Sequence, residues 1–103
     1  MRVAQAKAVS IEGHPDPSFN GLYTHDSTHE GWPVLLSDLG MYLYHHAPYG
    51  QWLLWKEYTP DSGVRNAGIR ANDGLLPVGA RAWNVWVGGR WLDYTLTLAL
   101  QSA

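Results

Sequence analysis

Glycine and proline occur at short intervals along the whole chain, and this spacing constrains the fold more than any other feature. The 103 residues include eleven glycines and six prolines. Most segments between turn signals are only about five to eight residues long, which is a typical strand length and is short for a helix. The chain is therefore predicted to be all-β.

Most of these segments also alternate apolar and polar residues with a period of two, as strands with one buried face do. About eight short antiparallel strands in a meander are expected, forming a small barrel or a two-sheet sandwich. Residues 1–103 are expected to form a single domain, in which 1–7 are a loose or edge segment. The candidate strands lie at about 7–12, 20–25, 33–36, 41–46, 51–57, 65–71, 81–87 and 90–98.

The stretch WNVWVGGRWLDYTLTL predicts a hairpin with a defined register. A two-residue Gly88-Gly89 connection suits a primed turn, because glycine adopts positive φ without steric cost. The predicted pairs are Val87 with Arg90, Trp86 with Trp91, Val85 with Leu92, Asn84 with Asp93 and Trp83 with Tyr94.

The register divides the hairpin into an apolar face and a mixed face. The apolar face is expected to be core and carries Trp83, Val85, Leu92, Tyr94, Leu96 and Leu98. The other face presents Trp86 directly opposite Trp91, with Asn84 and Asp93 beside them. This pair either stabilises the hairpin, or is covered by another segment, or forms an exposed surface that binds a protein partner or a sugar ring.

The stretch QWLLWKE places two tryptophans three residues apart, so in a regular strand they point to opposite faces. If APYG (47–50) is a four-residue loop, Trp52 pairs with His45 and Trp55 with Tyr42. Trp52 is then expected in the core, and Trp55 with Tyr42 outside, as a further part of the ligand or partner surface. A bulge would reverse this assignment.

The stretch HDSTHE (25–30) concentrates side chains that can bind metals or protons. The helical zinc motif places its Glu between two histidines, whereas Glu30 follows the second of His25 and His29. The flanking NGLYT and GWP also do not favour a helix. A polar loop between two strands is expected, with His25 and His29 as weak metal candidates and no other metal site or cofactor predicted.

Composition argues against several classes of function. Seven basic and nine acidic residues give a net charge of −2, which offers no positive field for nucleic acid. There are no cysteines, so no disulfide, CxxC pair or thiolate zinc site can form. No segment has the ~20 apolar residues of a membrane-spanning helix, so no membrane partner is expected. The compartment remains undecided.

An ordered series of short motifs extends from about residue 8 to 98. It comprises NGLY (20–23), GWPV (31–34), LYHH (43–46), QWLL (51–54), LPVGARAW (76–83) and GGRWLDYTLTL (88–98). This series resembles a small Trp/Tyr-rich domain found singly or in tandem in proteins of algae and marine microbes. The resemblance implies an all-β fold and a module for display or interaction, and it implies no catalytic residues.

Together these observations predict a non-catalytic binding module that uses exposed aromatic surface toward a protein or carbohydrate partner. Two alternatives belong to other classes. One is a structural unit that self-associates, for example as a homodimer, through its edges or tryptophan faces. The other is a small metal-dependent enzyme that uses the stretch from His25 to Glu30.

Overall fold

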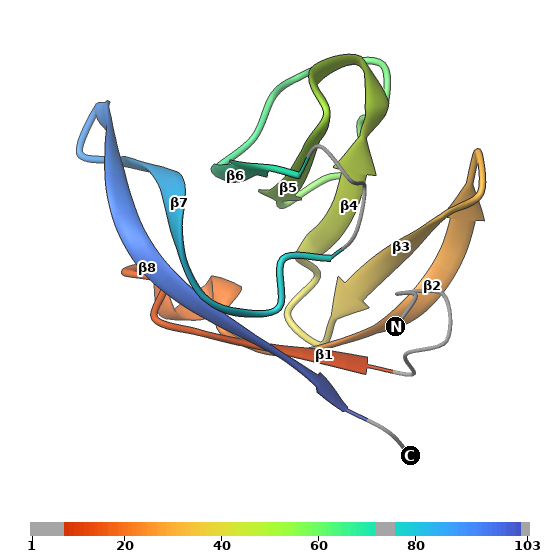
Figure 1. Ribbon diagram of the computed structural model, residues 1–103, viewed down its shortest axis with the longest axis horizontal. Coiled ribbons are helices and arrows are strands. Elements are labelled where there is room, and N and C mark those ends of the chain that lie inside the picture. Colours follow the sequence, from red (N-terminus) through yellow and green to blue (C-terminus); the bar gives the residue numbers. More distant parts are fainter. Residues whose placement is uncertain (1–7, 72–75, 102–103) are drawn as a thin grey trace.

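The computed structural model describes residues 8–71 and 76–101. Eight antiparallel strands follow one another in sequence order, and the last pairs with the first to close a barrel (Figure 1). The all-β meander is therefore confirmed, and of the two predicted forms the chain adopts the barrel. The strands are β1 (Ala8–Glu12), β2 (Gly21–His29), β3 (Trp32–Ser37), β4 (Tyr42–His46), β5 (Gln51–Trp55), β6 (Ala67–Arg70), β7 (Gly79–Val87) and β8 (Arg90–Gln101).

Most strands lie close to the predicted segments, although β2 continues to His29 instead of ending near residue 25. Two single 3-10 turns lie in the described connections. These are η2 (Pro17–Phe19) and η3 (Ala47–Tyr49). The second forms the expected APYG loop, in which Gly50 has a φ of 61° and its N–H donates to the Ala47 carbonyl. The N-terminal segment 1–7 and the turn signal at 72–74 lie outside the described residues.

The predicted register of the β7–β8 hairpin is confirmed at every pair from Val87 with Arg90 to Trp83 with Tyr94. Gly88 and Gly89 have φ values of 59° and 85°, as the primed turn requires. The register continues to Gly79 opposite Leu98. This hairpin is the longest in the structure and rises at one side of the barrel (Figure 1).

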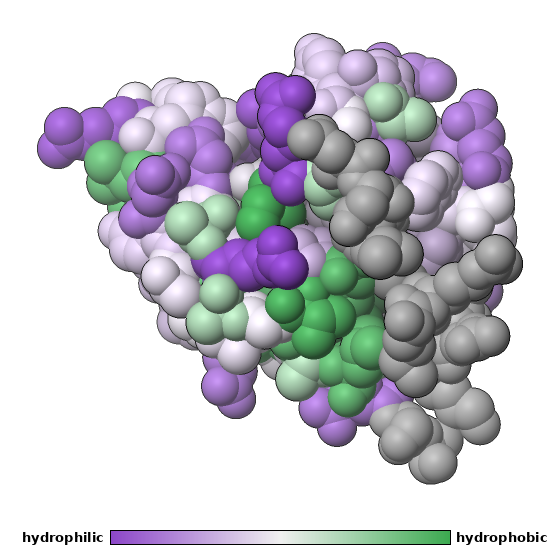
Figure 2. All heavy atoms as spheres, in the orientation of Figure 1, coloured by the Kyte–Doolittle hydropathy of each residue, from purple (hydrophilic) through white to green (hydrophobic). Residues whose placement is uncertain are grey.

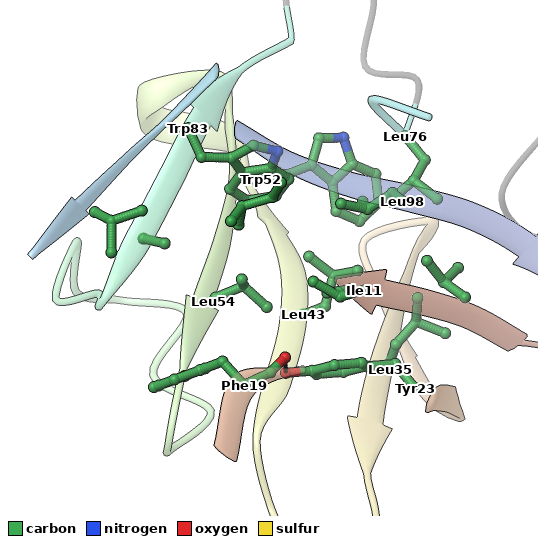
Figure 3. Close-up of a cluster of buried hydrophobic side chains, with 14 residues drawn as sticks. Ile11, Phe19, Tyr23, Leu35, Leu43, Trp52, Leu54, Leu76, Trp83 and Leu98 are labelled. Carbon is green, nitrogen blue, oxygen red and sulfur yellow. Dashed lines mark hydrogen bonds between the residues drawn. The ribbon is translucent and has the colours of Figure 1, made fainter. Parts of the chain in front are cut away.

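Large apolar side chains fill the barrel interior, as expected for eight strands. Trp52 and Trp83 lie at one level, Phe19 and Tyr23 lie at the opposite end, and aliphatic side chains occupy the space between (Figure 3). The Tyr23 hydroxyl donates to the Phe19 carbonyl at 2.8 Å. The buried members of this core are Val9, Ile11, Phe19, Tyr23, Leu35, Leu43, Trp52, Leu54, Ala67, Leu76, Trp83, Val85, Leu96 and Leu98.

The prediction that Leu92 belongs to the core is wrong, because its side chain is 36% exposed. Leu92 does lie opposite the fully buried Val85. However, β1 pairs with β8 only from Thr97 onward, so the part of β8 that carries Leu92 has a strand neighbour on one side only. Tyr94 is half-buried on the same part of β8.

The prediction of a polar loop at HDSTHE is also wrong, because β2 continues to His29. The chain turns at Glu30 and Gly31, where φ is 52° and 84°. Between His25 and Ser27 the pairing with β3 shifts by one residue, which is a β-bulge. The segment is thus a strand with a bulge and a tight turn, although its side chains are exposed.

A second, smaller apolar cluster covers part of the outer wall on β3, β4 and β5. Val34, Tyr44 and Leu53 are its buried members. Tyr58, from the connection between β5 and β6, packs on this cluster, with its ring 5.0 Å from that of Tyr44. The connection therefore serves as a partial cover for this side of the barrel.

One face of the molecule has polar residues scattered over most of its area and apolar residues gathered in a limited region (Figure 2). Within the described parts of the chain, no helix has the length and apolar character needed to cross a membrane.

Candidate functional site

Trp86 and Trp91 form an exposed cross-strand pair on the outer wall of the barrel. The two residues are 45% and 39% exposed, so both indoles remain accessible to solvent. The ring centroids are 5.2 Å apart and the planes meet at 64°, an edge-to-face arrangement. The pair therefore presents indole surface to solvent from the paired strands β7 and β8.

Asn84 and Asp93 form the next pair on the same wall and also face solvent. The Asn84 amide Nδ2 donates to Asp93 Oδ1 at 3.3 Å. This contact places a carboxylate and an amide beside the two indoles. Both groups can form hydrogen bonds with hydroxyls of a bound molecule.

Arg65, from the connection between β5 and β6, lies against Trp91 and Tyr49. Its guanidinium carbon is 5.1 Å from the ring centroid of Trp91 and 5.8 Å from that of Tyr49, which is 50% exposed. Cations at such distances over aromatic rings are attracted by the negative ring faces. Trp86, Trp91, Tyr49 and Arg65 together are called the aromatic surface below.

Asn66, next to Arg65, forms hydrogen bonds that connect the aromatic surface to the rest of the barrel. Its N–H donates to the Leu54 carbonyl and its carbonyl accepts from the Trp86 N–H, both at 2.8 Å. Its side-chain Oδ1 lies 2.6 Å from Nε2 of the buried His14. The residue before β6 is therefore held by β5, by β7 and by the connection that follows β1.

His14 is held as a neutral imidazole with a defined tautomer. The Asp16 N–H donates to His14 Nδ1 at 2.9 Å, so the ring proton is on Nε2, which donates to Asn66. The His14 ring also stacks on Phe19 with centroids 4.6 Å apart. Burial lowers the pKa of His14, while its contact with Asn66 and the charge of Asp16 oppose this shift.

Tyr42 and Trp55 pair as predicted and lie on the outer wall, where both are half-buried. They pack with Tyr58 on the smaller apolar cluster, so they are less accessible than the Trp86–Trp91 pair. Both pairs lie at the same level of the wall, because Asn66 links the level of Trp55 to that of Trp86. At the usual strand spacing, β5 and β7 are about 10 Å apart.

His25 and His29 are both exposed, and their nearest partners are different. His25 Nε2 lies 3.1 Å from the Thr28 hydroxyl, whereas His29 Nε2 lies 3.9 Å from a Glu30 carboxylate oxygen. The His29 ring also approaches Tyr58 edge-on. The described residues contain no group of three or more His, Cys, Asp or Glu side chains arranged to hold a metal ion.

His45 and His46 point to opposite sides of β4, as their adjacent positions predict. The His45 ring lies between Trp32, stacked at 4.0 Å, and Trp52, edge-on at 5.4 Å. His46 is buried next to Tyr49. Burial lowers the pKa of both histidines, and the charge of Arg65 adds to the shift at His46.

Comparison of this chain with protein-family models, with curated proteins and with solved structures finds no match. The assignment of the candidate site therefore depends on the geometry of this structure alone.

Sequence reasoning found Trp86, Trp91, Asn84 and Asp93 from the hairpin register, but it missed Arg65 and Tyr49. Both come from connections, and period-two alternation gives no direction for side chains outside strands. Gly63 was a weak signal for the position of Tyr49. The Tyr49 ring lies against the backbone of Gly63, and a Cβ added at Gly63 would be only 2.8 Å from Tyr49 Cζ.

Proposed function

We propose that this protein is a non-catalytic binding module that binds a carbohydrate at its aromatic surface. The observation that carries the proposal is the exposed Trp86–Trp91 pair, whose rings contact each other across the hairpin beside the polar pair of Asn84 and Asp93. Indole faces stack on the C–H faces of sugar rings, and neighbouring amide and carboxylate groups bind their hydroxyls.

Isolated exposed tryptophans are unremarkable on a soluble domain, but two that touch each other form a larger apolar area with a fixed shape. The hairpin holds both side chains before any ligand arrives, so little conformational entropy would be lost on binding. This supports stacking on a preformed surface.

The experiment is calorimetric titration of the purified chain with neutral oligosaccharides of several linkages. We expect the Trp86→Ala and Trp91→Ala variants to lose most of the affinity, whereas Leu22→Ala, which removes an exposed apolar side chain from β2, should retain it. Trp55→Ala tests whether the Tyr42–Trp55 pair also belongs to the surface.

The same aromatic surface could mediate contact between two copies of the chain. Size measured by light scattering on the same samples separates the two functions. A dimer that dissociates on Trp86→Ala, with no binding of any oligosaccharide, would favour the self-associating unit over the carbohydrate module.

A further inference from the structure

Resting on the proposed function, we propose that the carbohydrate bound by this protein carries an anionic group, a carboxylate or a sulfate, and that Arg65 binds that group. The inference begins with the position of the Arg65 guanidinium, which lies against the rings of both Trp91 and Tyr49. A sugar stacked on the Trp86–Trp91 pair would have its edge next to this cation.

The Arg65 side chain is held in place along its length. Nη1 donates to the Gly63 carbonyl at 2.9 Å. Its Cδ and Nε lie over Gly68, where an added Cβ would be 3.1 Å from each. The position occupied by glycine on β6 therefore leaves room for the arginine stem to cross the outer wall, so the cation is fixed before a ligand binds.

The charge of Arg65 is unpaired within the described chain. No described carboxylate lies within ion-pair distance of its guanidinium, and its buried Nε has no hydrogen-bond partner. Asp93, the acid of the Asn84–Asp93 pair, accepts from Asn84. A guanidinium carries five N–H donors in a planar fork. One N–H of Nη1 donates to Gly63 and the buried Nε is closed to a ligand, so the remaining N–H groups of Nη1 and Nη2 are the donors left for an anion.

Anions with two or three oxygens match this fork, because carboxylate and sulfate can accept two parallel hydrogen bonds from one guanidinium. Asn84 and Asp93 then remain for the neutral hydroxyls of the sugar. A carbohydrate that combines a stacking face with an acidic edge fits these groups better than a neutral sugar, which would leave the charge of Arg65 without an anion to balance it.

The test is calorimetric titration at low salt with four probes of equal length: tetraglucose, tetraglucuronate, sulfated tetraglucose and a tetraglutamate peptide. We expect at least one acidic sugar to bind about tenfold more tightly than tetraglucose, since a hydrogen-bonded charge pair contributes on this order. The better of the two acidic sugars identifies the anionic group. Added salt should reduce this difference.

The variants are Arg65→Gln, Arg65→Lys and Arg81→Gln. Arg65→Gln should bind acidic and neutral sugars equally, and Arg65→Lys should recover part of the preference because it keeps the charge without the fork. Arg81 lies on the same strand as Trp86, about 17 Å away along β7, so Arg81→Gln removes an equal charge and should change nothing.

Equal affinity of the wild-type protein for acidic and neutral sugars, or an equal loss in Arg81→Gln, would overturn the anionic preference. So would tetraglutamate binding as tightly as tetraglucuronate, because the sugar ring would then contribute nothing. Tetraglucose binding that requires Trp86 leaves the proposed function standing after such a result, whereas binding of no sugar at all overturns both.

Discussion

Trp83 and Trp86 lie three residues apart on β7 and differ completely in environment. Trp83 is fully buried in the barrel interior, whereas Trp86 is 45% exposed on the outer wall. Their neighbours across the hairpin differ in the same way, since Trp83 faces the half-buried Tyr94 and Trp86 faces the exposed Trp91. One strand therefore supplies the core with one indole and the candidate site with another.

Residue type alone therefore does not separate core from site in this chain. The period-two geometry of the strand does so, together with what covers each face. The two tryptophans should accordingly respond to the same substitution in opposite ways, one through stability and the other through binding.

The largest expected effect comes from Trp83→Ala. Removing a fully buried indole leaves a large cavity, and we expect a loss of about 3 to 5 kcal/mol in the free energy of unfolding. Urea unfolding followed by circular dichroism measures it. Trp83→Phe should cost clearly less, because the indole N–H of Trp83 is buried without a partner and its loss removes no hydrogen bond. Equal losses in the two variants would contradict this account.

A smaller loss is expected from Asn66→Ala, which removes the side-chain contact with His14 and keeps the backbone hydrogen bonds of residue 66. The substitution leaves the buried Nε2–H of His14 without an acceptor, at a cost of about 1 to 3 kcal/mol. A double-mutant cycle with His14→Phe isolates the interaction, since the His14 variant has no N–H to satisfy. Additive losses in that cycle would show that the two side chains are not coupled.

Mild acid should destabilise the protein through His14. Burial lowers the folded-state pKa of His14 below the ordinary value of 6.5, so below that pH the unfolded chain binds more protons than the folded one. The stability that neutral His14 contributes is therefore fully present above pH 6.5. It is lost as the pH falls from 6.5 through the pKa of His14 in the folded protein. Lowered pKa values at His45 and His46 act in the same direction.

Urea midpoints measured between pH 7.5 and pH 5 provide the check for this effect. The His14→Phe variant should show a shallower decline than the wild-type protein, with a residual slope from the other two histidines. An unchanged slope would assign the acid sensitivity elsewhere.

The smallest effect on stability is expected from Trp86→Ala. Losing one member of an exposed cross-strand aromatic pair should cost about 0.2 to 1 kcal/mol. The same variant should lose most of the carbohydrate affinity. Trp86→Ala is thus expected to affect binding more than stability, whereas Trp83→Ala is expected to affect stability most. A loss of several kcal/mol in urea unfolding would mean that Trp86 belongs to the structural core of the hairpin.

The extent to which sequence predicted this structure depended on local geometry. Gly88-Gly89 fixes both the turn and the register, so the facing of Trp86 and Trp91 follows from parity alone. The APYG loop likewise placed Trp52 opposite His45 and inside the barrel. In both cases a short turn connects the two strands, so the pairing of residues across the hairpin can be predicted without knowing where distant segments lie.

The errors occurred where local geometry was insufficient. Leu92 has the parity of a core residue, but its exposure depends on how far β1 extends along β8. Glu30 adopts positive φ, which is uncommon for a residue with a side chain, so the turn after His29 gave no clear signal. Arg65 reaches Trp91 only because the barrel brings the connection between β5 and β6 close to β8, which is distant in sequence, and because Gly68 leaves space for the arginine side chain.

The pairing that closes the barrel has a mechanical consequence. The ladder between β1 and β8 has five residue pairs, which begin at Ala8 with Gln101 and end at Glu12 with Thr97. Because the strands are antiparallel, the start of β1 and the end of β8 leave this ladder from the same end. A pulling force applied to those two points would break the residue pairs one after another. The barrel should therefore open at low force, even though large apolar side chains fill its interior.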